Sequence, residues 1–183
     1  MRRAPQAPST LWRLRRKLGP YRGPLNADVR PPKMGTVRHI FVAAECGSPM
    51  LSLEEVEAVT DIGLRGDRYA QAQNRKSADY QLTLIELENI EAFVQASGLP
   101  LAPHEPRRNL VTVGVRLNEL CGEHFLVGSV ELEGLELCEP CGTFAKRTHP
   151  QVVRHFVHKG GLRCRIIRGG VIRVGDAIAQ TAA

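Results

Sequence analysis

The clearest alternation of apolar and polar positions lies in residues 129–137. Apolar side chains occupy the even-numbered positions Val130 and Leu132, and after Gly134 they move to the odd-numbered positions Leu135 and Leu137. A period of two predicts a β-strand, and a one-residue slip at a glycine is typical of a β-bulge. We therefore expect a bulged strand that redirects the residues following it.

Short strand-like runs recur along most of the chain. We expect strands at residues 37–43, 56–62, 109–113, 123–127, 130–137, 164–168 and 171–174. Gly169-Gly170 predicts a hairpin between the last two runs, and Gly128-Ser129 and Gly175-Asp176 mark further turns. Many short strands separated by turns favour a closed or nearly closed barrel over a parallel sheet. The predicted fold class is mainly β with a few helices, an α+β protein built around a β-barrel.

Residues 84–97 have the period of an amphipathic helix. One face carries the apolar side chains Leu87, Ile90, Phe93 and Val94. Thr83 and Glu86 have capping-box spacing, and Gly98 is followed by Pro100, which is typical of a helix end. A second, shorter helix is possible around residues 152–157, and it would carry His155 and His158.

The charge of the chain is concentrated at its beginning. Residues 1–34 hold nine Lys or Arg and one acid, Asp28, so the remaining residues carry a net charge of −2 although the whole chain carries +6. We expect residues 1–34 to be a flexible, basic, Pro-rich extension and residues 35–183 to form one domain. The leader resembles an organellar transit peptide, and Met34 could instead be the true start. Since the excess charge forms no patch with interleaved aromatics, nucleic-acid binding is not predicted.

Composition indicates a cytoplasmic protein with reduced thiols. Five cysteines are an odd number, no secretory signal precedes them, and no apolar stretch approaches the length of a transmembrane segment. A hydrophobic content of 43% in 183 residues is sufficient for one sizeable core. Organellar import through the basic leader is the alternative location.

Two thiols, Cys138 and Cys141, lie in a short turn after the bulged strand, in the sequence Cys-Glu-Pro-Cys. Pro140 fixes φ and removes a backbone donor, so Cys141 is expected on an exposed loop. One alternative is structural zinc bound by Cys138, Cys141, His155 and His158. The two histidines are separated by two residues, whereas zinc fingers usually have three to five.

Five motifs in order connect the chain with a known family: Gly63-Leu64-Arg65-Gly66-Asp67-Arg68, Gln81-Leu82-Thr83-Leu84-Ile85, Arg107-Arg108-Asn109-Leu110, Cys138-Glu139-Pro140-Cys141 and Gly170-Val171-Ile172-Arg173-Val174-Gly175-Asp176. Together they resemble a MOSC domain, the family named after the C-terminal domain of molybdenum-cofactor sulfurases. The resemblance covers about residues 36–178 and is greatest to the small stand-alone bacterial members.

The resemblance implies a β-barrel-rich domain that binds the molybdenum cofactor or handles sulfur for metal-sulfur centres. Matching the Ser-Arg-Cys motif of related amidoxime-reducing proteins selects Cys141 as the catalytic residue and molybdenum ligand, with Cys138 as the backup. The family Arg-Pro-Asn pattern likewise places Arg107 and Asn109 near the cofactor, with Arg68 and Thr83 as further candidates. Here Arg108 replaces the proline and Glu139-Pro140 replaces Ser-Arg, which puts tight cofactor retention in question.

The residue types suit this chemistry independently of the family, because a soft metal favours thiolate and a phosphate favours guanidinium. A metal-free sulfur carrier would instead use an accessible, low-pKa thiolate at Cys141 to take up sulfur from a persulfide, with Cys138 able to resolve it.

Full sulfurases pair this domain with a pyridoxal-phosphate-dependent desulfurase, for which 183 residues are too few. We therefore expect no pyridoxal phosphate site in this chain. A cysteine desulfurase or a cofactor-delivery protein is an expected partner, and reduction of N-hydroxylated substrates would require a separate redox partner.

Overall fold

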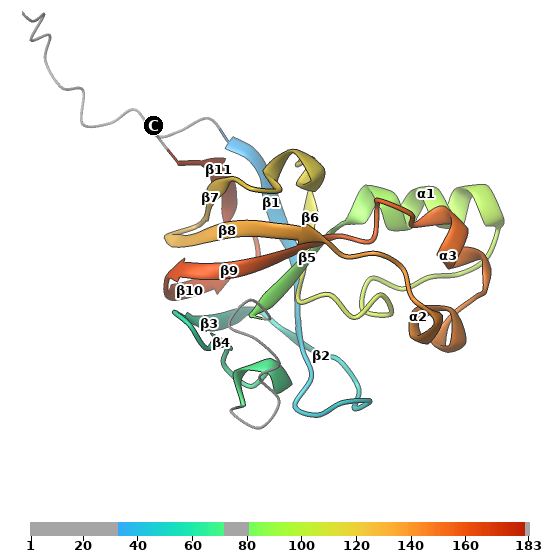
Figure 1. Ribbon diagram of the computed structural model, residues 1–183, viewed down its shortest axis with the longest axis horizontal. Helices are drawn as coiled ribbons and strands as arrows, with labels where there is room; N and C mark the ends of the chain where they lie inside the picture. The colour runs from blue at the N-terminus through green and yellow to red at the C-terminus, as the bar shows by residue number, and fades with distance from the viewer. Residues whose placement is uncertain (1–32, 72–80, 182–183) are drawn as a thin grey trace, which may run out of the picture. The chain divides into compact units, whose positions relative to one another are not determined.

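A closed, mixed β-barrel forms the centre of the computed structural model, which describes residues 33–71 and 81–181 (Figure 1). Its strand order is β11-β7-β8-β9-β5-β6-β1, and pairing of β1 with β11 closes the ring. Only β5 and β6 run parallel among these neighbours. The seven strands are β1 (Lys33–Val42), β5 (Leu82–Glu86), β6 (Leu110–Val113), β7 (His124–Val127), β8 (Val130–Leu137), β9 (Leu162–Arg168) and β11 (Ala177–Gln180). The predicted barrel class is confirmed.

A short strand, β2 (Leu51–Leu53), pairs with the end of β1, and the first β1 residues, Lys33 and Met34, belong to the extension predicted at residues 1–34. The rest of that extension lies outside the described residues. None of the helices in the described ranges is long and apolar enough to cross a membrane.

A second sheet contains β10 (Gly170–Arg173), β3 (Glu55–Val59) and β4 (Gly63–Leu64). The predicted hairpin at Gly169-Gly170 is wrong, because β10 pairs with β3 instead of β9. A Cβ added at Gly169 would lie 2.6 Å from the backbone oxygen of Ala58. This glycine therefore permits a close backbone approach between strands, a requirement that resembles a turn signal in the sequence.

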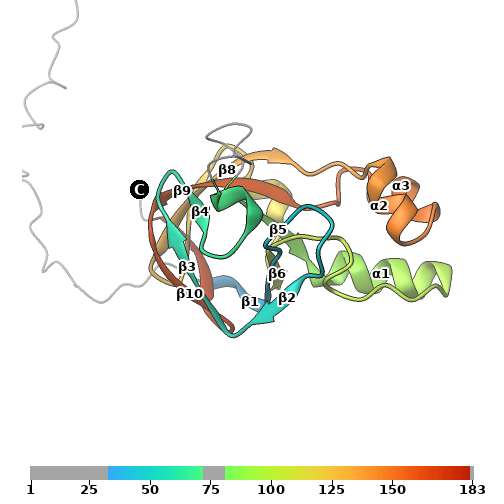
Figure 2. The same cartoon turned by 90° about the horizontal axis from the view of Figure 1, so that it is seen from below.

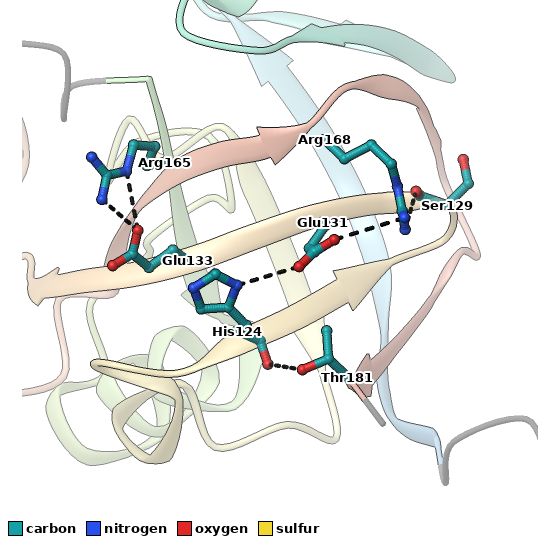
Figure 3. A network of polar contacts seen from close by, with 7 residues as sticks. All are labelled: His124, Ser129, Glu131, Glu133, Arg165, Arg168 and Thr181. Atoms are coloured by element: carbon teal, nitrogen blue, oxygen red, sulfur yellow. Dashed lines mark hydrogen bonds and ion pairs between the residues drawn. The ribbon is translucent and has the colours of Figure 1, made fainter. Parts of the chain in front are cut away.

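The bulge predicted in β8 is confirmed. Its register against β9 shifts between Gly134 and Glu136. A Cβ at Gly134 would collide with the backbone oxygen of Leu120, at the end of the 3₁₀ segment η3 (Leu117–Leu120). On the outer face, ion pairs connect β8 with its neighbours, including Glu133 with Arg165 (Figure 3).

The protein has two hydrophobic clusters, one inside the barrel and one among the helices. The first fills the barrel and includes Leu84, Phe125 and Leu132. The second packs α1 (Leu87–Ser97), α2 (Gly142–Arg147) and α3 (Gln151–His155) together through Phe93, Phe144, Phe156 and neighbours. The three helices lie at one side of the barrel in both views (Figure 1, Figure 2). The Cys138–Cys141 turn connects the end of β8 with the start of α2.

The helix expected at residues 84–97 begins three residues later than predicted. Residues 82–86 form β5, paired with both β6 and β9, so Thr83 is a strand residue and caps no helix. Strand pairing on both sides outweighs the local capping signal. The predicted end is correct, since Gly98 has φ 69° and donates its N–H to the Val94 oxygen.

Candidate functional site

Cys141 is the residue preceding the first turn of α2, and its side chain is exposed. A hydrogen bond from the backbone N–H of Phe144 is the largest factor that lowers the pKa of the Cys141 thiol below the ordinary value of 9.0. Partial burial opposes this, while the Thr143 N–H and the positive charge of Arg108 add to it. Cys141 can therefore present a thiolate to an approaching electrophile or metal. The predicted exposed loop position of Cys141 is confirmed. The helix that follows it was not predicted, because six helical residues are too few for a visible period.

Cys138 has the opposite environment, although it lies only three residues away. It is 4% exposed, and burial raises the pKa of its thiol. The Cys138 N–H donates to the Gly161 oxygen. A Cβ added at Gly160 would collide with the carbonyl oxygen of Cys138. Close backbone packing thus buries the first thiol of the turn and leaves the second exposed.

Cys141 lines a cavity of about 250 Å³ together with four arginines, Arg68, Arg107, Arg108 and Arg147. We call this cavity the arginine pocket. The arginines come from three separate parts of the chain: the 3₁₀ segment η1 (Arg68–Ala70), the loop before β6, and α2. A neighbouring cavity of about 290 Å³ shares Arg107 and Arg147 with it. Four guanidinium groups therefore line the cavity together with the thiol, and the charge of Arg108 acts on it directly.

Arg107 has the most unusual environment of the four. Its φ is 58°, and its Nη1 donates to the Ser48 oxygen at 2.8 Å. Its Nη2 is buried and has no hydrogen-bond partner among the described residues. Burial, and then the charges of Arg68 and Arg147, lower the pKa of Arg107. A buried donor without a partner is costly, and an anion in the pocket would satisfy it.

Arg108 and Arg68 contact neutral groups instead of acids. Arg108 donates from Nε to the Gly160 oxygen at 2.8 Å, and Arg68 lies 4.3 Å from the centre of the Tyr69 ring. Glu105 also lines the pocket, but its carboxylate accepts the Ala102 N–H at 2.6 Å. Within the described ranges none of the four pocket arginines forms an ion pair, so their charge is available to a ligand.

Asn109 and Thr83, both predicted to bind cofactor, bind one another. The Asn109 Oδ1 accepts from the backbone N–H and the hydroxyl of Thr83, both at 3.0 Å. The Asn109 Nδ2 donates to the Phe41 oxygen at 3.2 Å and to Asp67 Oδ2 at 3.1 Å. Asn109 is buried, and its hydrogen bonds join β5 and β1 two residues after Arg107 in the sequence. It therefore fixes the position of the arginines, while Thr83 lines a small adjoining cavity.

Comparison with known proteins places this site in a family. The MOSC domain model matches residues 70–179, which is more than half of the chain. The protein belongs to the MOSC domain family. The matched residues include Arg107, Arg108 and Cys141, whereas Arg68 precedes them. No curated protein matches the chain by sequence.

Solved MOSC-like structures share the fold at low sequence identity. The YUAD protein from Bacillus subtilis is 18% identical with a TM-score of 0.67, and the alignment covers 81% of this chain and 97% of that one. YiiM from Escherichia coli is 17% identical, with a TM-score of 0.61 and coverage of 83% and 71%. YiiM from Geobacillus stearothermophilus is 14% identical, with a TM-score of 0.59 and coverage of 82% and 73%. At these identities the likeness establishes the fold alone.

The zinc site considered as an alternative to MOSC chemistry is wrong, because its four ligands do not come together. His158 Nδ1 lies 2.7 Å from Glu139 Oε1, and His155 stacks edge-on against Phe93 and Phe156. Among the described residues, no group of three or more His, Cys, Asp or Glu side chains could hold a metal ion. The helix expected here is shorter than predicted, and His158 lies beyond α3 with φ 57°.

Three residues in or near the arginine pocket were not predicted as site residues from the sequence: Cys46, Asp67 and Arg147. Cys46 and Arg147 line the pocket, and Asp67, 1% exposed, accepts the N–H groups of Ala43 and Tyr69 beneath it. Asp67 belongs to the first family motif, but nothing in that motif predicts its buried hydrogen bonds. Arg147 could have been found from the sequence, because it is a cation six residues after Cys141. Cys46 could not, because no local pattern connects it with Cys141.

Proposed function

We propose that this MOSC-domain protein binds the molybdenum cofactor in the arginine pocket, with the Cys141 thiolate as the ligand for molybdenum. One observation carries the proposal: Arg107, whose Nη2 is buried without a partner, and Cys141, whose thiol has a lowered pKa, line the same cavity. A guanidinium donor suits the phosphate of a pterin cofactor, and a thiolate suits a soft metal. The two required chemistries therefore occur together.

The donors of the pocket fit such a group. Arg107 has one donor bound to Ser48 and another without a partner, so it can bind a phosphate without losing its anchor. Arg68 and Arg147 lie close enough to Arg107 for their charges to lower its pKa. Arg147 supplies a cation on α2, while the family pattern has its arginine in the cysteine turn, where this chain has Pro140. We infer that Arg147 takes over part of that role.

The residues of the chain would then have separate tasks. Arg108 favours the thiolate form of Cys141 through its charge. Asn109 and Asp67, joined by a hydrogen bond of 3.1 Å, hold the loop that carries Arg107 against the barrel. When bound, the cofactor would supply two-electron redox chemistry, for example reduction of N-hydroxylated substrates with electrons from a separate redox partner.

A second candidate function is sulfur carriage without bound metal. It is favoured by the exposure of Cys141 and by a further exposed thiol, Cys46, that lines the same cavity. An accessible, low-pKa thiolate attacks the outer sulfur of a donor persulfide efficiently. A cysteine desulfurase is the class of partner that would supply this persulfide.

The test measures molybdenum and pterin in protein purified from cells that make the cofactor, comparing wild type with Cys141→Ser. We expect about one molybdenum and one pterin per chain in wild type, and loss of molybdenum in Cys141→Ser, because a hydroxyl is a poor ligand for a soft metal. Cys121→Ser is the matched control, since Cys121 is exposed and its thiol donates to the Leu135 oxygen. Wild-type protein without pterin or molybdenum would contradict cofactor binding and leave sulfur carriage as the function.

A further inference from the structure

Two exposed thiols from distant parts of the chain line the arginine pocket. Cys141 is at the start of α2, and Cys46 lies in the loop between β1 and β2. Both line the cavity of about 250 Å³ together with Arg107 and Arg147. The remaining cysteines differ: Cys138 and Cys164 are buried, and Cys121 lies beside the β8 bulge, bridged to Gly134. The fold therefore pairs Cys46 with Cys141 in one cavity.

The loop that carries Cys46 is held in a defined shape. The N–H of Ser48 donates to the Glu45 oxygen at 3.3 Å, and the N–H of Glu45 donates to the Ser48 hydroxyl at 3.2 Å. These bonds close a turn with Cys46 and Gly47 at its tip. The Ser48 carbonyl in turn accepts from Arg107 Nη1 at 2.8 Å. The turn is thus fixed to the pocket by one of the arginines that line it.

The same turn faces α2. A Cβ built on Gly47 would lie 3.8 Å from Nη2 of Arg147, which is on the helix that directly follows Cys141. The two elements are therefore in contact beside the two thiols. A disulfide between the two thiols requires their Cα atoms to lie within about 7 Å of each other, so its formation is the step that the experiment below measures.

We propose that Cys46 is the resolving thiol for sulfur carried on Cys141. This inference rests on the sulfur-carrier form of the proposed function. The thiolate of Cys141 first takes the outer sulfur from a donor persulfide, forming Cys141–S–SH and releasing the donor as a thiolate. The thiolate of Cys46 then attacks Sγ of Cys141. A Cys46–Cys141 disulfide forms, the persulfide S–S bond breaks, and hydrosulfide leaves with the bonding electron pair. Two equivalents of a low-molecular-weight thiol reduce the disulfide and restore the pocket.

The charges around the pocket favour these steps. Arg107 and Arg147 line the cavity together with both thiols. The leaving hydrosulfide is an anion released among guanidinium groups. The structure also assigns this role to Cys46 in preference to Cys138, which the sequence suggested, because burial raises the pKa of Cys138 and removes it from solvent.

The experiment treats reduced, full-length protein with glutathione persulfide and follows hydrosulfide release by bimane labelling, with intact and peptide mass spectrometry of the protein. We expect wild type to release about one hydrosulfide per chain and to lose two hydrogens by forming a Cys46–Cys141 disulfide. Cys46→Ser should gain one sulfur atom on Cys141 and release hydrosulfide at least about tenfold more slowly, because it lacks the high effective concentration of an internal thiol. Cys121→Ser should behave as wild type.

Each outcome decides the inference. Release by Cys46→Ser at the wild-type rate, after sulfur has reached Cys141, overturns the role of Cys46 and leaves sulfur carriage intact. A disulfide mapped to Cys138 and Cys141 overturns it in the same way. If Cys141 takes up no sulfur in any variant, sulfur carriage and the resolving role both fail, whereas cofactor binding is judged by its own metal and pterin analysis.

Discussion

Arginines of the outer barrel face and arginines of the pocket have opposite surroundings. On the barrel, Arg165 Nη2 lies 2.6 Å from Glu133 Oε2, and Arg168 lies 3.8 Å from Glu131 (Figure 3). In the pocket, none of the four arginines forms an ion pair within the described part of the chain, and Arg107 has a buried donor without a partner. The same residue type thus supports the sheet in one region and remains available to a ligand in the other.

The difference shows how stability and binding are separated in this protein. Exposed ion pairs each contribute roughly 0–1 kcal/mol to stability, so the barrel arginines are individually dispensable. Clustered cations repel one another and lower the stability of the unliganded protein, and a bound anion reverses that effect. We therefore expect substitutions in the two regions to act on different measurements.

The largest effect on stability is expected when the hydrogen bonds of Asn109, which support the pocket, are removed. Asn109→Ala should lower the free energy of unfolding by about 2–4 kcal/mol, because it leaves buried groups of Thr83, Phe41 and Asp67 short of hydrogen bonds. Urea denaturation followed by circular dichroism measures this. Asn118→Ala is the control, since the Asn118 side chain makes one exposed hydrogen bond, to the His158 oxygen. Equal losses for both variants would contradict a supporting role for Asn109.

A smaller change in free energy, confined to binding, is expected for Arg107→Gln. Pterin retention should fall by about tenfold to a hundredfold, because a charge-assisted hydrogen bond to phosphate contributes roughly 1.5–3 kcal/mol. Stability should change by less than about 1 kcal/mol, since the substitution removes repulsion between the arginines as well as the bond to Ser48. Pterin content after dialysis, with denaturation curves, measures both effects.

Arg168→Ala on the barrel is the matched control and should leave pterin retention unchanged. If both variants lose pterin equally, the distinction between paired and unpaired arginines has no functional meaning.

The smallest expected effect concerns the pH at which Cys141 reacts. Hydrogen bonding by the Phe144 N–H lowers its pKa in the folded protein, so the thiolate and its stabilising contribution persist below the ordinary value of 9.0 and are lost as the pH falls through the folded pKa. Iodoacetamide labelling mapped by mass spectrometry should reach half its maximal rate at Cys141 below pH 9.0. Cys138, whose pKa is raised by burial, is the internal control. Arg108→Gln should move the pH profile of Cys141 labelling towards higher pH. Identical labelling profiles for Cys141 and Cys138 would contradict the difference in pKa between the two thiols.

Most of the barrel could be predicted from the sequence because its strands carry local signals. The pattern at residues 130–137 gave both the strand β8 and its bulge at Gly134. Errors occurred where a tertiary partner determines the result. Thr83 looked like a helix cap but lies in β5, opposite Arg163 of β9. Gly169 looked like a hairpin glycine but permits the close approach of β3.

The candidate site was less predictable, because its parts are brought together only by the fold. Family motifs pointed to Arg107 and Cys141, and the structure places both in one pocket. They also pointed to Asn109, whose side-chain donor and acceptor are occupied by protein groups. Cys46 lies in a turn with no motif, and its proximity to the pocket depends on the β1–β2 loop facing α2. No spacing rule spans such a distance.

Closure of the barrel determines when this protein can first function during its synthesis. Pairing of β1 with β11, with Lys33 opposite Ala179, closes the ring. The barrel therefore cannot close before β11 has left the ribosome. At roughly 5–20 residues per second the interval between the synthesis of β1 and that of β11 is on the order of ten seconds. Until then β1 has an unpaired edge, which is a target for chaperones or for aggregation. Any loading of the pocket in the closed barrel consequently follows the synthesis of β11.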